Sequence, residues 1–285
     1  MKYIRIIPRL DIKGPNLVKG IHLEGLRVLG KPEEFAKLYY EQGADELIYQ
    51  DTVASLYQRN SLTDIITKTA KNIFIPITVG GGLRTLDDIN KVLRAGADKV
   101  AINTAAIQNP GFITEASHAF GSSTIVIAIE TIKQSDNSYL AYTDNGREHT
   151  GVDAISWAKE AEERGAGEIL LTSIDQEGTG NGFDLELIKR VSDLVTIPVI
   201  AHGGAANGSH IYEALNDSGA DAVAVASMLH YSALNRNGNL VSDYNTEGNT
   251  EFLKKKGSFK MFGKENIIEI KDQLNEYDIP LRILN

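Results

Sequence analysis

Short apolar runs alternate with amphipathic segments along most of the chain. The runs are four to eight residues long and have the composition of β-strands. They cover Tyr3–Leu10, Glu46–Gln50, Phe74–Val79, Lys99–Ile102, Ser123–Ile129, Glu168–Thr172, Val195–Ala201 and Ala222–Val225. The segments between them have apolar residues at helical spacing and predict helices over Pro32–Gln42, Thr63–Asn72, Leu86–Ala95, Pro110–Phe120, Ala154–Arg164, Leu185–Asp193 and Ile211–Ser218.

This alternation predicts the fold class. Several strands are continuously apolar, as expected of parallel strands that are covered on both faces. Eight alternating βα units predict an α/β protein formed by a single (β/α)₈ TIM barrel over residues 1–285. An open, doubly wound sheet is the alternative, and it is disfavoured because no G-x-G-x-x-G motif follows the first strand.

An internal repeat divides the predicted barrel into two halves. Three short segments recur after 122 or 123 residues. The pairs are Gln42–Leu47 with Arg164–Ile169, Val79–Gly82 with Ala201–Gly204, and Ala95–Val100 with Ser218–Val223. We therefore expect two half-barrels related by an approximate twofold axis, with equivalent sites on opposite sides of one mouth.

One region departs from the pattern. Tyr231–Gly263 is polar and precedes a last predicted helix over Glu265–Glu276. We interpret it as an insertion that forms a surface loop, with a functional lid as the alternative.

Composition excludes several functions. Apolar residues make up 42% and charged residues 24%, which is normal for a globular protein. The absence of cysteine excludes disulfides, thiol nucleophiles and iron–sulfur clusters. The six histidines lack metal-binding spacing, so we expect no metal, and no motif indicates a cofactor.

Net charge and hydropathy limit the kinds of partner that the protein can have. The net charge of −9 argues against nucleic-acid binding, and no apolar run is long enough to span a membrane. The first ten residues carry Lys2, Arg5 and Arg9, which is not the pattern of a signal peptide. We therefore expect a cytoplasmic protein.

Glycines and hydroxyl or amide residues gather where paired strands end. In a barrel of this type the active groups come from the carboxyl ends of the strands. Such glycines expose backbone N–H groups that bind anions, although most glycine-rich segments are only tight turns. The first group is Gly81, Gly82, Asn103 and Thr104, and its repeat mate is Gly203, Gly204, Ala226 and Ser227. Their symmetry favours two phosphate sites and an elongated, doubly phosphorylated ligand.

Two acids lie between these groups. Asp11 and Glu130 follow the first and fifth apolar strands, at positions suited to general acid–base catalysis on a ligand held at both ends. Solvated strand-end acids are the alternative. Lys19 follows Asp11 in a predicted loop, where it contacts a phosphate or shapes the loop. Asp175 and Thr179 follow the sixth strand and are further candidates for ligand binding.

Charged residues also occur at the opposite, N-terminal ends of four strands. They are Arg5, Glu46, Lys99 and Glu168. Charges on this face usually serve solubility or stability. The alternative is that these charges interleave in a ring that closes the bottom of the barrel.

The combined motifs resemble the cyclase subunit of imidazole glycerol phosphate synthase. The resemblance covers nearly the whole chain to about His230 and resumes in the last helix. The matching segments are Ile6–Lys13, Val18–Gly20, Val79–Gly82, Lys99–Ala106 and Gly167–Asp175.

This resemblance implies a function in histidine biosynthesis. In that family a glutaminase subunit docks on the bottom of the barrel, and ammonia passes through the barrel to a ribulosyl-phosphate carboxamide ribotide. The products are imidazole glycerol phosphate and an aminoimidazole carboxamide ribotide. By match, Asp11 and Glu130 are the catalytic acids, and Arg5, Glu46, Lys99 and Glu168 gate the ammonia.

The chain departs from the family at positions around the mouth. Glu130 and Glu177 stand where Asp is usual, and Arg9 stands where Cys is usual. The 231–263 insertion is also unusual. These differences keep two alternatives open, which are a paralogue that amidates a sugar for surface polysaccharides and a non-catalytic scaffold. An isomerase of the same pathway is disfavoured, because it needs no bottom gate.

Overall fold

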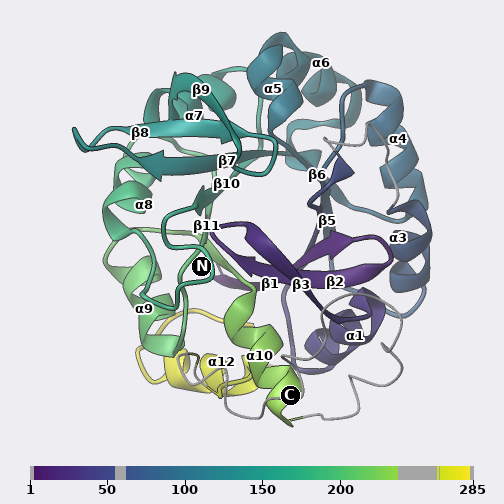
Figure 1. The fold of residues 1–285 in the computed structure, drawn as a ribbon, viewed down its shortest axis with the longest axis vertical. Helices are drawn as coiled ribbons and strands as arrows, with labels where there is room; N and C mark the ends of the chain where they lie inside the picture. The colour runs from purple at the N-terminus through teal and green to yellow at the C-terminus, as the bar shows by residue number, and fades with distance from the viewer. Residues whose placement is uncertain (1–2, 55–61, 237–261, 263, 283–285) are drawn as a thin grey trace.

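Eight parallel strands form a barrel surrounded by helices, so the predicted fold class is confirmed (Figure 1). The computed structural model describes residues 3–54, 62–236, 262 and 264–282. The barrel strands are β1 (Arg5–Lys13), β4 (Leu47–Asp51), β5 (Ile77–Gly80), β6 (Lys99–Ile102), β7 (Ile125–Lys133), β10 (Glu168–Ser173), β11 (Val199–His202) and β12 (Ala222–Val225).

The hydrogen-bonded ladder closes on itself. β1 pairs in parallel with β4 on one side and with β12 on the other. The circuit continues through β5, β6 and β7, and β7 pairs with β10 to reach β11 and β12. The open-sheet alternative is therefore wrong. All carboxyl ends of these strands meet at one mouth.

Helices cover the outside of the barrel. The helices with eight or more residues are α1 (Pro32–Glu41), α3 (Thr63–Ala70), α4 (Leu86–Ala95), α6 (Gly111–Phe120), α7 (Ala154–Glu163), α8 (Leu185–Ser192), α9 (Gly208–Asn216), α10 (Ser227–Arg236) and α12 (Ile267–Asn275). The short elements are α5 (Thr104–Gln108) and the 3₁₀ turn η1 (Ser122–Thr124). Local signals fix several ends: Thr85 and Asn266 each form a capping box, and Gly96 ends α4 in a left-handed conformation.

Side-chain alternation along β1 shows how the interior is layered. Ile6 and Leu10 belong to the large core between the barrel and the helices, whereas Ile7 belongs to a separate cluster inside the barrel. Because a strand repeats every two residues, Arg5 lies below Ile7 and Arg9 above it on the inner face. The same strand therefore carries charge at the bottom, an apolar side chain in the middle and charge at the mouth.

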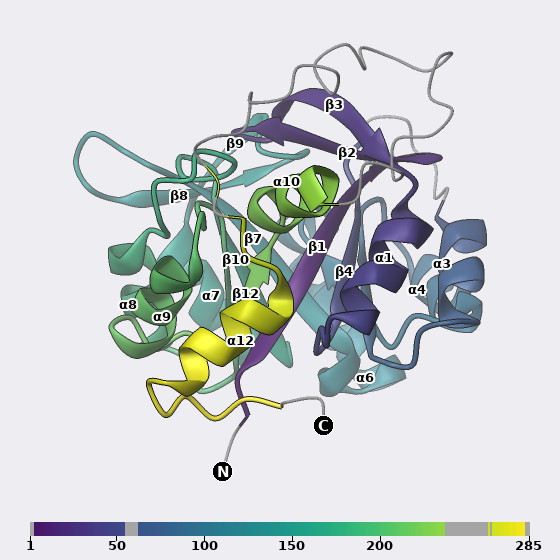
Figure 2. The same cartoon turned by 90° about the horizontal axis from the view of Figure 1, so that it is seen from below.

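Two hairpins extend the mouth and were not predicted. β2 (Asn16–Ile21) and β3 (Glu24–Gly30) follow β1, while β8 (Tyr139–Thr143) and β9 (Glu148–Asp153) follow β7. Figure 2 shows them at the end of the barrel opposite the chain termini. Lys19 lies in β2, so its predicted place in a loop was wrong.

The proposed boundary of the polar insertion was also wrong. Tyr231 to Arg236 continue α10, and Tyr231, Ser232 and Ala233 are buried, because the apolar side of this helix faces the core. Residues 237–261 and 263 lie outside the described residues, and so does the choice between surface loop and lid. Within the described chain, no helix combines the length and apolarity needed to cross a bilayer.

Candidate active site

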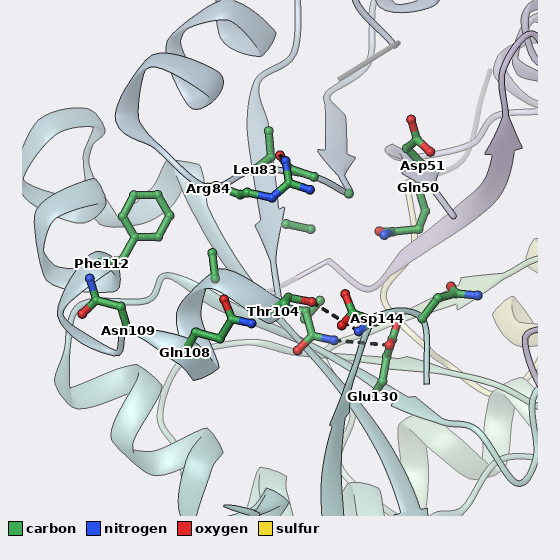
Figure 3. Close-up of a pocket in the computed structure, with 17 residues that line it drawn as sticks. Gln50, Asp51, Leu83, Arg84, Thr104, Gln108, Asn109, Phe112, Glu130 and Asp144 are labelled. Carbon is green, nitrogen blue, oxygen red and sulfur yellow. Dashed lines mark hydrogen bonds between the residues drawn. The ribbon is translucent and has the colours of Figure 1, made fainter. Parts of the chain in front are cut away.

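The first glycine group lines a cavity of about 460 Å³ at the mouth. Gly81, Gly82, Asn103 and Thr104 all contribute to its wall, together with Glu130 (Figure 3). The backbone N–H of Asp144, in the turn after β8, donates to Thr104 Oγ1 at 3.3 Å. These contacts bring residues from β5, β6, β7 and the second hairpin around one space.

The second glycine group lines a much smaller cavity, of about 10 Å³. Gly203, Gly204, Ala226 and Ser227 form one side, and Glu177, in the loop after β10, and His202, at the end of β11, also contribute. The two groups therefore lie at one mouth, in separate cavities. The repeat thus preserves the glycine turns, whereas the space beside them differs in volume.

Backbone conformation explains why glycine occupies these turns. Gly81 has φ +99°, and a Cβ there would collide with the backbone oxygen of Asp51. Gly204 has φ +105°, and a Cβ there would collide with the backbone oxygen of Gly182. Both positions need the left-handed conformation and the close approach that only glycine allows.

Asp11 lies in a buried ionic chain beneath the second cavity. Its Oδ1 accepts from Arg9 Nε at 2.9 Å, and its Oδ2 accepts from Lys19 Nζ at 2.9 Å. Lys19 also pairs with Glu177. All four side chains are at most 2% exposed. Burial alone would raise the pKa of Asp11, but the charges of Arg9 and Lys19 outweigh it and lower that pKa well below its usual range.

Glu130 has a different environment, although it lies across the same mouth. It accepts from Asn103 Nδ2 at 3.2 Å, and within the described residues no cationic side chain bonds to it. Burial raises the pKa of Glu130 to about 7, against the lowering influence of Arg9 and of the Gly146 backbone. The two candidate acids therefore differ in protonation near neutral pH.

Two candidate ligand-binding residues lie outside both cavities. Asp175 is exposed, and its carboxylate accepts from the Lys133 backbone N–H at 2.8 Å. Thr179 donates to the Gln176 carbonyl at 2.7 Å and so closes its own turn. Neither residue is among those that line the two cavities, whereas Glu177 and Gly178 between them line the second cavity.

Further residues complete the mouth: Arg9 and His202, which the sequence already placed near it, and Arg84, Asp144 and Asn145, which sequence reasoning missed. Arg9 and His202 meet across the barrel, with Nη1 of Arg9 3.1 Å from Nδ1 of His202. Burial and the Arg9 charge lower the pKa of His202 well below its ordinary value. Arg84 lines the first cavity and bonds to Gly82 and Ala54 backbone oxygens. Asp144 and Asn145 line it as well, and the Asn-Gly pair at Asn145 is a hairpin signal that could have been used.

At the other end of the barrel, four charged side chains form a closed ring. Arg5 bonds to Glu46 at 2.8 Å and to Glu168 at 3.1 Å. Lys99 bonds to the same acids, at 3.0 Å and 3.2 Å. Each cation thus bridges both carboxylates. Of the two alternatives for these residues, the geometry is that of an interleaved ring.

Between the ring and the mouth the interior is apolar. One cluster of buried residues fills this layer, with small side chains contributed by β6, β7 and β12. Its members are Ile7, Ile48, Ala101, Val126, Ala128, Leu170, Ile200, Ala222 and Ala224. Among the described residues, no group of three potential metal ligands was found.

Fold and site together define a class of protein. It is a (β/α)₈ barrel with two acids between two glycine-lined cavities at one end and an ionic ring at the other. A sequence profile described as histidine biosynthesis protein matches residues 5–235.

Curated relatives agree with that profile. A protein of Legionella pneumophila is 63% identical over 204 residues, covering 72% of this chain and 96% of the relative. A Trichormus variabilis protein is 48% identical over 233 residues, which are 81% of this chain and 91% of the relative. A Nostoc protein is 42% identical over 282 residues, which are 98% and 97%. All three are named imidazole glycerol phosphate synthase subunit HisF.

The chain therefore belongs to the histidine biosynthesis family, as a cyclase subunit of the imidazole glycerol phosphate synthase type. This confirms the resemblance found in the sequence. The relatives' names give no support to the sugar-amidating paralogue or to the scaffold.

Proposed function

We propose that this protein joins ammonia to a ribulosyl-phosphate carboxamide ribotide, giving imidazole glycerol phosphate and an aminoimidazole carboxamide ribotide. The observation that carries the proposal lies on one strand. The inner face of β1 carries Arg5 in the closed ring at the bottom and Asp11 at the mouth, with apolar Ile7 between them. A barrel built this way separates the entry of a small neutral reactant from the place where it reacts.

The mouth suits a ligand with two phosphates and sugar hydroxyls. Backbone N–H groups of the two glycine turns and the hydroxyls of Thr104 and Ser227 are anion donors in both cavities. Arg84 adds a positive charge to the first cavity. Carboxyl and amide groups of Asp51 and Asn145 line the same cavity and can bond ribose hydroxyls. The larger cavity would hold the bulkier end of the ligand.

The two acids lie between those anchors. Glu130 lines the first cavity directly, while Asp11 lies deeper in the ionic chain. A ligand pinned at both ends leaves the reacting atoms little freedom, which is how positioning contributes to rate. Asp11 and Glu130 are therefore the residues to which we assign catalysis at the reacting atoms.

Ammonia would enter from the ring. The apolar layer above the ring favours neutral ammonia over ammonium, because an unpaired charge is costly to bury. We propose that Arg5, Glu46, Lys99 and Glu168 form the gate and that a glutaminase subunit docks around them. Large apolar side chains are exposed in segments that precede barrel strands at this end: Tyr3 before β1, Phe74 before β5 and Leu194 before β11. Such side chains are typical of the core of a protein interface.

The direct experiment is ammonia-dependent turnover of the ribulosyl ribotide by the isolated subunit. Formation of both products, with glutamine turnover requiring a glutaminase subunit, is the expected result. The Glu130→Asp variant separates this function from a changed substrate. A working cyclase acid at this position predicts that the variant is slower or nearly unchanged. Wild-type protein that is inactive on the ribotide, but gains activity in Glu130→Asp, would contradict the proposal.

A further inference from the structure

The residue that most distinguishes this mouth is Arg9. Its guanidinium is 1% exposed and lies inside the barrel at the level of the two acids. Nε donates to Asp11 at 2.9 Å, and Nη1 lies 3.3 Å from Thr172 Oγ1 and 3.1 Å from His202 Nδ1. Nη2 has no hydrogen-bond partner in the described structure. A buried guanidinium in this position contacts one acid and leaves the other without a cationic partner.

We propose that Arg9 is a positioning residue that divides the work of the two acids. It holds Asp11 as a carboxylate, so that Glu130 alone carries the proton exchanged with the ligand. This inference rests on the proposed function of the mouth. It assigns different roles to two residues that the repeat relates.

The groups around each acid support this division. Asp11 faces Arg9 from its own strand, Lys19 from β2 and His202 from β11, and its two oxygens already accept charge-assisted hydrogen bonds. Protonating Asp11 would leave Arg9 and Lys19 without their shared anion in a buried site, which is strongly unfavourable.

The surroundings of Glu130 lead to the opposite result. It faces the Asn103 amide, the Gly146 backbone, the carboxyl of Asp144 and the more distant charges of Arg9 and Asp11. Burial and the neighbouring carboxyls favour its protonated form, against the distant Arg9 charge and the hydrogen bonds from the Gly146 backbone and the Asn103 amide. Its pKa of about 7 leaves a substantial protonated fraction at neutral pH.

The proton transfers then balance within one addition. As the ammonia nitrogen bonds to the ribulosyl carbonyl carbon, Glu130 gives its proton to the carbonyl oxygen. The nitrogen is then positively charged, and it returns one proton to the Glu130 carboxylate. Asp11 stays ionised throughout and supplies the negative charge that orients the cationic nitrogen.

The test is the pH dependence of ammonia-dependent turnover, corrected for the free ammonia present at each pH. For wild type we expect kcat to fall as pH rises above about 7 and Glu130 loses its proton. In Arg9→Met the falling limb should move to higher pH by about one unit, because the Arg9 charge that lowers the Glu130 pKa is gone. Arg9→Lys should restore the wild-type limb, and Arg94→Met on the exposed face of α4 is the matched control.

Other outcomes would overturn the inference. If Arg9 has only a structural role, Arg9→Met should lower kcat at every pH without shifting the falling limb of the pH profile. If Arg9 instead binds the ligand directly, Arg9→Met should raise KM and leave both kcat and the falling limb of its pH profile unchanged. If wild type does not turn over the ribotide at all, the proposed function is wrong. Turnover with an unshifted pH profile in Arg9→Met would instead show that only the role inferred for Arg9 is wrong.

A second measurement does not depend on activity. Carboxyl ¹³C NMR of wild type, with resonances assigned by Glu130→Gln and Asp11→Asn, reports each protonation state directly. We expect Glu130 to titrate near neutral pH while Asp11 stays ionised down to about pH 4. Two carboxyl groups that are both ionised from pH 5 to 8 would overturn the proposal.

Discussion

The barrel holds two ionic clusters, one at each end, each with two cations and two carboxylates, and they are built differently. At the bottom, Arg5 and Lys99 each bridge Glu46 and Glu168, so every charge has two partners in a closed ring. At the mouth, Arg9, Asp11, Lys19 and Glu177 form an open chain.

The difference lies in what each arrangement leaves unpaired. The ring is partly exposed and self-sufficient, with side chains up to 21% exposed. The chain at the mouth is buried, leaves Arg9 Nη2 without a partner and lies beside Glu130, whose pKa is raised. A closed ring suits a barrier that opens and closes, whereas an open chain next to an unpaired acid suits chemistry. Substitutions made at one end of the barrel at a time separate the two roles.

The largest effect is expected from Asp11→Asn. The amide keeps the shape but removes the negative charge shared by Arg9 and Lys19. We expect ammonia-dependent turnover to fall by at least about 10³-fold, because the negative charge that orients the cationic nitrogen is lost as well. Circular dichroism should verify folding, because the orphaned cations also destabilise the protein. Activity close to wild type would remove Asp11 from the catalytic residues.

Glu130→Gln should lower turnover by about 10²-fold and change the pH dependence of stability. Because the folded-state pKa is about 7 and the ordinary value 4.5, wild type loses stability as pH rises between them. The Gln variant lacks that loss, so relative to wild type it should gain roughly 1–3 kcal/mol between pH 4.5 and 8. Urea unfolding at both pH values measures it. An equal difference at the two pH values would show that the Glu130 pKa is not raised.

Lys99→Ala tests the ring. Removing one bridging cation opens the ring and leaves Glu46 and Glu168 with Arg5 alone. We expect glutamine-dependent turnover to fall by about 10-fold. A loss of this size agrees with the few kcal/mol at most that a partly exposed ion pair contributes. Ammonia-dependent turnover should change less than about 2-fold, because free ammonia can enter at the mouth. The exposed Lys91→Ala is the control, and equal losses in both assays would reject a gate.

The smallest effects concern the two cavities. Thr104→Val and Ser227→Ala each remove one hydroxyl from a cavity wall. Each should raise the KM of the ribotide about 3- to 10-fold with little change in kcat, because a single hydrogen bond contributes about 1 kcal/mol. An effect confined to one variant would mean that only one cavity binds phosphate.

The sequence predicted the barrel well because strands and helices are local. Strands Lys99–Ile102 and Ala222–Val225 and helix Leu86–Ala95 were predicted with their observed ends. The hairpins were missed because β2 and β3 alternate weakly in burial and contain glycines. The period-two alternation along β1 places Arg5, Arg9 and Asp11 on one face.

The candidate site could be predicted only in part. The glycine groups and both acids were found because each directly follows an apolar strand. The contact of Arg9 with His202 joins residues 193 positions apart, and no local pattern reveals it. The different sizes of the two cavities were equally hidden, since the repeat argues for equal sites.

The most direct test of the central claim follows the nitrogen atom from one end of the barrel to the other. Wild-type protein with a glutaminase subunit would be given amide-¹⁵N glutamine, the ribulosyl ribotide and unlabelled ammonium in excess, and the imidazole glycerol phosphate would be analysed by mass spectrometry. The account predicts that the product carries mainly ¹⁵N and that Lys99→Ala dilutes the label. A wild-type product with the isotope ratio of the bulk ammonium would show that the reactive nitrogen does not pass through the barrel, and would contradict the account.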